Sequence, residues 1–331
     1  MMRNQDIVNS EDEYTNTPDV PQNKSENTNN VPDTDNQING NGKVVNYDSH
    51  GSISVKGRRK YMEDALTVDL GFLMWESNNY DYFGVYDGHG GSEVARACRD
   101  HLHLLVKNEV EKQARKIIDW EKVMVTSFLR MDEHVLAEGV EGSTGSTAIV
   151  VVVGEEVLVV ANCGDSRGVF SRSSTVVPLS FDHKPDRPDE LKRIEVSGGV
   201  VVNLNGKRVQ GVLSTSRSIG DEHLKPYVVA QAEVTVKARS DLDEFIIVAS
   251  DGLWDVMSNE DACKVVRFCL QRQSQEGSKK KSSVTPGNEN EPKSRAAVAA
   301  LNLKRIAMKR GSQDNISVIV IDLQKLHKTS A

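Results

Sequence analysis

The sequence predicts an α+β fold, in which antiparallel strands occupy stretches of the chain separate from the helices. Short runs rich in valine, isoleucine and aromatic residues indicate the strands. Gly154 and Glu155 separate two valine-rich runs, and such a break predicts a hairpin and therefore antiparallel pairing. Grouped strands and helices favour this class over a Rossmann-type alternation. The predicted strands are 83–86, 146–153, 157–161, 168–171, 244–249 and 315–321.

Helix signals mark the ends of several further stretches. One helix is expected to begin after Ser92, a candidate N-cap, and its apolar residues are spaced for one buried face. Another has Pro188 in its first turn and ends at Gly198. A third opens at Ser258 with a pattern that resembles a capping box. These helices supply the α part of the predicted fold.

Length and composition predict a single large domain with polar flanks. At 331 residues and 38% hydrophobic content, the chain can bury one large core, which we place at 48–325. Residues 1–47 are rich in Asn, Asp, Ser, Thr and Pro, so we expect a disordered tail, and 326–331 form a short C-terminal tail. The polar stretch 271–293 predicts a surface loop between two helices. Its three lysines at 279–281 are typical of a solvated loop, with a nuclear address as the alternative.

Charge and hydropathy argue against several classes of partner. A net charge of −7 disfavours nucleic acid as the main ligand, because binding to a phosphate backbone needs a basic face. Neither a run of about 18 apolar residues nor a secretory signal is visible, so we expect no membrane partner. The 4 cysteines match no zinc spacing and lie mainly in apolar runs, which predicts reduced core residues. The absence of coiled-coil heptads favours a monomer.

Two predicted strands end in the same dipeptide. Asp87-Gly88 follows one strand and Asp251-Gly252 follows another. A single Asp-Gly is most often a turn, because glycine adopts the required backbone conformation easily. Its repetition at the ends of two apolar strands instead suggests carboxylates held where a rigid strand meets solvent.

Further carboxylates extend this pattern. Asp314 lies at the start of a predicted strand, and Glu63-Asp64 lies near the start of the domain. If the strand ends meet at one rim, these side chains repel one another unless a cation lies between them. Oxygen ligands without histidine or thiolate favour Mg²⁺ or Mn²⁺ over zinc. A two-metal centre of this kind can activate water and hold a phosphoryl group for attack.

Residues beside these carboxylates fit phosphate chemistry. Gly88 lets the backbone approach a metal closely and offers its carbonyl as a ligand. His89 is placed to protonate a leaving alkoxide as general acid. A phosphate dianion also needs a cation to orient it, and Arg58-Arg59-Lys60 supplies candidates. Composition alone does not choose among these three, and a solvated basic run is the alternative.

Together these segments resemble the PP2C-type protein phosphatases, also called the metal-dependent PPM family. The resemblance covers about 50–325, and several ordered motifs are far more specific than any one of them. It implies a β-sandwich of two antiparallel sheets with helices on both outer faces, and a binuclear Mg²⁺ or Mn²⁺ site at one edge. The motifs lie at 57–64, 82–91, 145–148, 161–167, 213–221, 249–255 and 311–315.

The resemblance also assigns roles to individual residues. It implies two metal ions and a weaker third, with hydrolysis of phosphoserine or phosphothreonine by a metal-activated water. Arg59, selected by its spacing from Glu63, corresponds to the phosphate-binding arginine, and His89 to the general acid. The implied metal ligands are Asp87, the Gly88 carbonyl, Asp251 and Asp314, with Glu63 and Asp64 in support and Asp165 joining Asp251 at the third ion.

Three segments resemble the plant group that restrains abscisic acid signalling. They are 180–186, 193–199 and 211–226, and they imply SnRK2-type kinases as substrates and hormone-bound receptors as inhibitors. Such a role implies a nuclear and cytoplasmic location. A plant phosphatase that opposes another kinase pathway is the alternative. Within the long flap 202–228, the expected contacts with partner or substrate are Leu204, Gln210, Gly211, Val212, Ser216 and Arg217.

Leu204 is a departure from that group. It stands where the group usually has a tryptophan whose indole enters the receptor, and Gln210 stands where phenylalanine is common. Leucine is smaller and lacks the indole N–H donor. Losing an aromatic anchor weakens an interface by about 2 kcal/mol or more, so we expect weakened receptor control.

Other function classes fit the sequence less well. An inactive scaffold would have lost metal ligands, and none of the motif carboxylates is missing. A hydrolase of small phosphate esters would not need the long flap. A calcium-binding module would need the EF-hand ligand pattern, which is absent.

Overall fold

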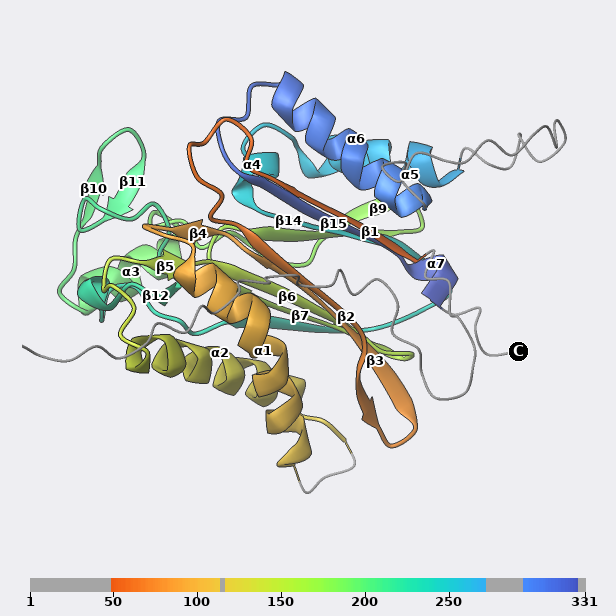
Figure 1. The fold of residues 1–331 in the computed structure, drawn as a ribbon, viewed down its shortest axis with the longest axis horizontal. Coiled ribbons are helices and arrows are strands. Elements are labelled where there is room, and N and C mark those ends of the chain that lie inside the picture. Colours follow the sequence, from red (N-terminus) through yellow and green to blue (C-terminus); the bar gives the residue numbers. More distant parts are fainter. Residues whose placement is uncertain (1–48, 114–116, 272–293, 327–331) are drawn as a thin grey trace, which may run out of the picture. The chain divides into compact units, whose positions relative to one another are not determined.

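Two antiparallel sheets stack face to face, and helices cover both outer faces (Figure 1). This computed structural model describes residues 49–113, 117–271 and 294–326. The α+β class and the two-sheet sandwich implied by the resemblance are confirmed. The predicted tail 1–47 lies outside the described residues, as do nearly all of the predicted loop 271–293 and the predicted tail 326–331. Within the described ranges, no helix is both long and apolar enough to cross a membrane.

The two sheets have five strands each. The first follows the order β1 (His50–Val55), β15 (Ile316–Asp322), β14 (Asp243–Ala249), β8 (Arg167–Arg172), β9 (Thr175–Pro178). The second follows the order β13 (Glu233–Ala238), β7 (Val157–Cys163), β6 (Ala148–Val153), β3 (Asn78–Tyr86), β2 (Ala65–Trp75). Gly154 donates its N–H to the Val157 carbonyl at 2.8 Å, which closes the predicted β6–β7 hairpin.

Alternation along the strands divides the core into layers. In β3, Phe83 points between the sheets, whereas Tyr82 points toward the helices. In β14, Ile246 lies between the sheets and Ile247 faces the helices on the other side. Because successive side chains of a strand point to opposite faces, strands buried on both faces read as nearly continuous apolar runs.

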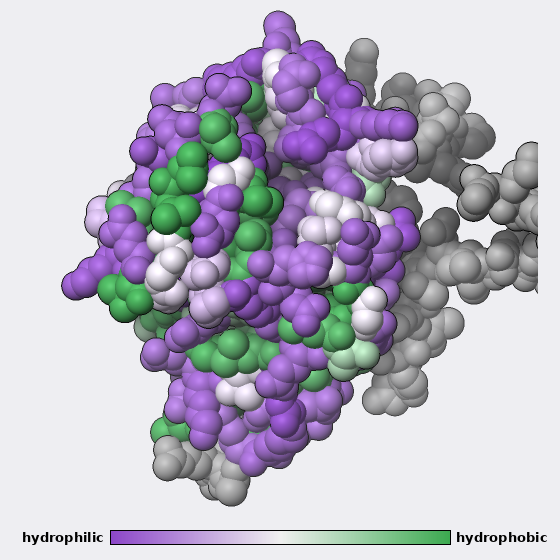
Figure 2. All heavy atoms as spheres, turned by 90° about the vertical axis from the view of Figure 1, so that its left-hand side faces the viewer, coloured by the Kyte–Doolittle hydropathy of each residue, from purple (hydrophilic) through white to green (hydrophobic). Residues whose placement is uncertain are grey.

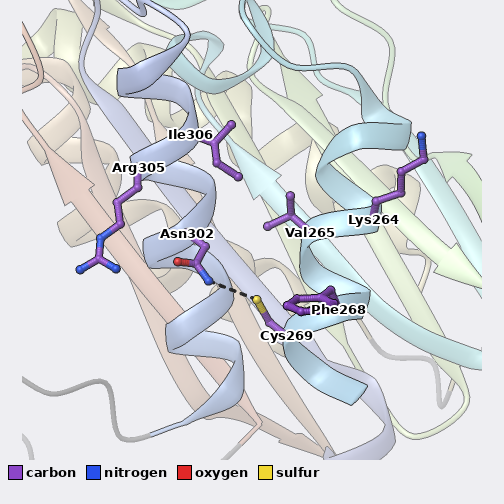
Figure 3. A pocket seen from close by; sticks show the side chains of 7 residues that line it. All are labelled: Lys264, Val265, Phe268, Cys269, Asn302, Arg305 and Ile306. Atoms are coloured by element: carbon purple, nitrogen blue, oxygen red, sulfur yellow. Dashed lines mark hydrogen bonds between the residues drawn. The ribbon is translucent and has the colours of Figure 1, made fainter. Parts of the chain in front are cut away.

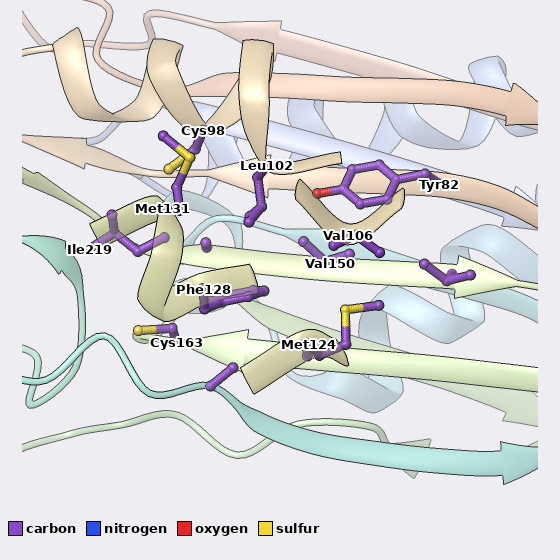
Figure 4. Close-up of a cluster of buried hydrophobic side chains, with 14 of the residues drawn as sticks. Tyr82, Cys98, Leu102, Val106, Met124, Phe128, Met131, Val150, Cys163 and Ile219 are labelled. Carbon is purple, nitrogen blue, oxygen red and sulfur yellow. The ribbon is translucent and has the colours of Figure 1, made fainter. Parts of the chain in front are cut away.

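Helices close the two outer faces of the sandwich. The second sheet is covered by α1 (Glu93–Glu111) and α2 (Trp120–Ala137), and the first by α5 (Asn259–Gln271) and α6 (Arg295–Lys309). Figure 4 shows Leu102 of α1 and Phe128 of α2 packed with Val150 of β6. The short helices are α3 (Pro188–Val196), η1 (Glu222–Leu224), α4 (Asp251–Trp254) and α7 (Leu323–Leu326).

The predicted strands and helices all form, with differences in detail. Helix α1 begins after Ser92 as expected, but the Ser92 side chain makes no capping hydrogen bond. Ser258 does cap, because its Oγ accepts from the Asp261 N–H at 3.1 Å. The predicted set omits α2, although Asp119 caps it and Phe128 belongs to its buried face. It also omits the edge strand β13, where polar residues alternate with valines and soften the apolar signal.

Two small elements sit at one end of the sandwich and shape the site. A three-stranded sheet joins β4 (Gly88–His89), β5 (Gly145–Ser146) and β12 (Ile219–Gly220). A hairpin of β10 (Val201–Asn203) and β11 (Lys207–Val209) forms the flap tip. In Figure 1 the small sheet lies beside the end of the sandwich, and the β10–β11 hairpin extends beyond it.

Candidate metal centre

The predicted carboxylates gather where the two sheets end. Asp87 follows β3 and Asp64 precedes β2, and these strands pair with Ala65 opposite Tyr86. In the other sheet, Asp251 follows β14 and Asp314 precedes β15, which are also neighbours. In Figure 1 this end carries β4 and α4. The strand ends that carry these carboxylates therefore lie at the same end of the sandwich.

Several short contacts tie the two sheets together at this end. The Ser250 hydroxyl donates to Asp64 Oδ2 at 2.9 Å, and the Glu63 N–H donates to Asn315 Oδ1 at 2.7 Å. A Cβ on Gly252 would lie 1.9 Å from the Asn315 carbonyl oxygen. Only glycine allows this approach, which brings the segment after Asp251 against the segment that carries Asp314.

The electrostatics of this cluster disfavour several negative charges at once. Burial, followed by the nearby charges of Asp64 and Asp251, raises the pKa of Asp87 well above its ordinary value. Burial and the charge of Asp165 do the same to the pKa of Asp251. Burial raises the pKa of Asp64 to about 6, although the hydrogen bond from Ser250 opposes the shift. A cation among these groups would relieve both the burial and the repulsion.

Unpaired oxygens and a backbone cradle fit such a cation. Asp64 Oδ1 and Asp251 Oδ1 are buried without a hydrogen-bond partner, an arrangement that is unfavourable unless another group binds them. A Cβ on Gly88 would lie 2.5 Å from the Glu63 carbonyl oxygen, so only glycine fits beside these ligands. The donor atoms are all oxygens, which suits Mg²⁺ or Mn²⁺.

Two carboxylates of the cluster are instead engaged with cationic side chains. Asp314 Oδ2 lies 2.5 Å from Arg59 Nη2, and Asp165 Oδ2 lies 2.6 Å from Lys184 Nζ. As the described side chains stand, no three His, Cys, Asp or Glu residues converge closely enough to hold an ion. Coordination would therefore require Asp314 or Asp165 to exchange a protein cation for a metal ion.

Arg59 lies at the cluster, whereas its basic neighbours do not. Its side chain is 53% exposed and contacts Asp314. Arg58 donates to the carbonyls of Ser312 and Met308 at 2.9 and 3.2 Å, so its guanidinium is already committed. The Lys60 ammonium lies over the Tyr61 ring. Among the three basic candidates, Arg59 is the one beside the carboxylates.

His89 is held by a residue absent from the predicted set. Its Nε2 donates to Asp221 Oδ2 at 2.7 Å, and the Asp221 side chain is 3% exposed. Asp221 has a left-handed backbone, with φ of 49°, and also accepts from the Ser218 hydroxyl. A Cβ on Gly145 would lie 2.1 Å from Asp221 Oδ2 and 2.5 Å from His89 Nε2, so the pair needs glycine there. A buried carboxylate that orients an imidazole is a recurrent catalytic arrangement.

Asp255 is a second residue that sequence reasoning missed. Its N–H donates to the Asp251 carbonyl at 2.8 Å, which is one helical turn, so both carboxylates emerge on one side of α4. Burial raises the pKa of Asp255, the nearby Lys184 opposes this shift, and Asp165 adds to it. Burial alone would lower the pKa of Lys184, but the charge of Asp165 outweighs it and raises that pKa. The spacing of two aspartates four positions apart was the available signal.

The flap divides the predicted partner-binding residues into two groups. Leu204 and Val212 are 54% and 60% exposed, and a Cβ on Gly211 would touch the Leu204 side chain at 3.4 Å. Gln210 turns the chain there with a φ of 52°. Figure 2 shows hydrophobic patches that interrupt the hydrophilic surface on the face of this end of the molecule. The exposed side chains of Leu204 and Val212 are therefore available to a partner.

Ser216 and Arg217 lie below the flap instead. The Ser216 hydroxyl is buried and donates to Glu190 Oε2 at 2.7 Å. Arg217 Nη2 lies 2.5 Å from Glu190 Oε1, and the guanidinium of Arg217 is largely enclosed. Ser216 and Arg217 therefore anchor the base of the flap to α3. Ser216 offers no side-chain surface to a partner in this conformation.

Comparisons with known proteins give this geometry a context. The sequence model of the family described as protein phosphatase 2C matches residues 48–316. Probable protein phosphatase 2C 8 of Oryza sativa subsp. japonica is 47% identical over 313 residues, covering 84% of this chain and 75% of the relative. Protein phosphatase 2C 37 of Arabidopsis thaliana is 45% identical over 305 residues, covering 85% and 73%.

Solved structures show the same fold. A sex-determining protein of C. elegans superposes with a TM-score of 0.69 at 25% identity, covering 83% of this chain and 64% of that one. A serine-threonine phosphatase 2C from Toxoplasma gondii superposes with a TM-score of 0.66 at 22% identity, covering 82% and 94%.

Proposed function

Because the chain belongs to the protein phosphatase 2C family, and is therefore a protein serine/threonine phosphatase, we propose that the carboxylate cluster at the sandwich end is its active site. The observation that carries this proposal is the pair of buried, unpaired oxygens on Asp64 and Asp251 within a group of mutually repelling carboxylates. The family generally depends on Mg²⁺ or Mn²⁺, and this cluster has the oxygen donors to bind either.

The residues that would hold two ions are those at the strand ends. We assign Asp87, the Gly88 carbonyl, Asp251 and Asp314 as principal ligands, with Glu63 and Asp64 in support. A weaker third ion would use Asp165 with Asp251, and Asp255 adds a carboxylate to that position. When bound, the ions supply positive charge that lowers the pKa of water and stabilises the phosphoryl group in the transition state.

Side chains of the protein bind the phosphate and supply the proton for the leaving group. Arg59 is long and half-exposed, so its guanidinium can turn from Asp314 to grip two phosphate oxygens. Because Nε2 is bound to Asp221, the proton that His89 donates to the leaving serine or threonine oxygen would come from Nδ1. Asp221 holds the imidazole in place from beneath, and Gly145 leaves room for this pair. Asp221 is thus a positioning residue.

A phosphate-release assay tests the site. With a phosphoserine peptide and Mn²⁺, the wild-type chain should release phosphate, EDTA should abolish the release, and Asp87→Asn should lower it by about 10²-fold or more. Asp69→Asn, which changes a carboxylate on β2 outside the cluster, is the matched control and should stay active. Activity that survives both EDTA and Asp87→Asn would show that the cluster is not the active site.

For the pathway, we infer a role as a negative regulator of abscisic acid signalling that dephosphorylates SnRK2-type kinases in the nucleus and cytoplasm as a monomer. The support is the resemblance of 180–186, 193–199 and 211–226 to that plant group, together with an exposed flap that suits a protein substrate. Leu204 at the flap tip predicts weak inhibition by hormone-bound receptors.

A flap substitution tests the pathway independently of the chemistry. Leu204→Trp restores the aromatic anchor and should strengthen receptor inhibition by about 30-fold, which corresponds to about 2 kcal/mol. Phosphate release without receptor should not change. Strong inhibition of the wild-type chain would refute the role of Leu204. No inhibition of either chain would favour a phosphatase that opposes another kinase pathway.

A further inference from the structure

A groove lies between the outward faces of α5 and α6. It encloses about 360 Å³, and its walls include Val265 and Phe268 of α5 and Ile306 of α6 (Figure 3). The floor is closed by a contact between the helices, because Asn302 Nδ2 donates to Cys269 Sγ at 3.3 Å. Phe268 is 63% exposed, so the groove presents apolar surface to solvent. None of these residues belongs to the carboxylate cluster.

Basic side chains border this groove. Figure 3 shows Lys264 and Arg305 on opposite sides, both extending away from the floor. Helix α6 contains Arg295, Lys304, Arg305 and Lys309 and no acidic residue, although the whole chain has a net charge of −7. Lys264 Nζ lies 3.7 Å from Asp261 Oδ1 on the same helix, whereas the side chains of Arg305 and Lys309 have no ion pair or hydrogen bond to another described residue. The charges of Arg305 and Lys309 are therefore available to an anionic partner, and a partner carboxylate would compete with Asp261 for Lys264.

Together, apolar walls and basic rims specify a ligand with an apolar centre and acidic flanks. We propose that the α5–α6 groove docks an acidic linear segment of a partner protein, with one or two large apolar side chains in the groove and carboxylates facing Lys264 and Arg305. The volume suits such side chains, since ligand pockets begin at about 300 Å³. A flat anionic membrane would meet the same charges but would not fill the hollow. Docking here would hold a partner outside the active site.

Fluorescence anisotropy with the full chain tests the proposal. The probe is a labelled 12-residue peptide with Leu-Phe at its centre and glutamates on both sides. Two control peptides replace Leu-Phe by alanines or the glutamates by lysines. We expect saturable binding of the probe, and at least about tenfold weaker binding of each control, because both the anchor and the charges are needed.

Groove variants locate the binding. Phe268→Ala and Arg305→Glu should each weaken the probe by about tenfold, whereas Lys122→Glu, an exposed charge reversal on α2, should not. Hydrolysis of a small phosphate ester should be unchanged in all of them, which shows that they fold. No saturable binding up to millimolar probe, or equal binding by the groove variants, would overturn the proposal. Phosphatidylserine vesicles run in parallel, and a preference for vesicles over the probe, lost in Arg305→Glu, would reassign the face to membranes.

Discussion

Asp221→Asn is the substitution that most sharply separates the general acid from the rest of the site. The change keeps the size of the side chain but removes the charge beside His89. The hydrogen bond spans 2.7 Å and the carboxylate is 3% exposed, so water screens it little. A hydrogen bond to a charged group contributes about 1.5–3 kcal/mol, and roughly half of this depends on the charge. A loss of about 0.8–1.5 kcal/mol lowers kcat by about 4- to 13-fold.

The choice of substrate decides whether this reasoning is right. A phosphoserine peptide has a poor leaving group and needs a proton donor, whereas p-nitrophenyl phosphate has a good leaving group and does not. We therefore expect Asp221→Asn to lower kcat on the peptide only. Ser218→Ala removes the second donor to Asp221 but keeps its charge, and it should have the smaller effect. Equal losses on both substrates would mean that Asp221 has only a structural role.

Three further predictions follow from the charges of the structure. Burial alone would raise the pKa of Glu190, but hydrogen bonds from Arg217, Arg193 and Ser216 lower it to about 2. The ionised Glu190 therefore stabilises the folded state by about 3 kcal/mol above pH 4.5, and this contribution is lost as the pH falls toward 2. In denaturant titrations, the free energy of unfolding of Glu190→Gln should fall less between pH 4.5 and pH 2 than that of the wild type. The pKa of Asp64 is about 6, so the carboxylate protonates below that pH, and calorimetry should show Mn²⁺ binding weaken and release protons as the pH drops from 7.5 to 5.5. Unchanged affinity would contradict this. Lys184→Gln removes the ammonium that pairs with Asp165, so a weak additional Mn²⁺ site should bind more tightly in the same calorimetric titration. Unchanged stoichiometry and affinity would show that Lys184 does not compete with an ion.

The sequence could reveal those site residues whose position follows from a strand end. Asp87 and Asp251 follow long apolar runs, so their place at a rim is a direct consequence of strand geometry. The role of Asp221 could not be predicted in this way, because Asp221 follows a strand of only 2 residues and meets His89 through a small sheet formed by distant segments. Local patterns do not report such long-range pairing.

The same limit explains the flap and the groove. Ser216 and Leu204 lie in one motif-rich segment, yet the fold buries the first and exposes the second. Burial there depends on Glu190 of α3, which is far enough along the chain that no periodicity links the two. The α5–α6 groove likewise exists only because two helices pack on the same sheet. Helix α2 is different, since its buried spacing was present in the sequence and could have been predicted.

Anomalous diffraction at the manganese edge, from crystals grown with Mn²⁺, tests the central claim most directly. If the carboxylate cluster is a two-metal phosphatase site, two strong peaks will lie between Asp87, the Gly88 carbonyl, Asp251 and Asp314, and Asp314 will have left Arg59. An absence of peaks among these residues in Mn²⁺-dependent, active protein would contradict the assignment.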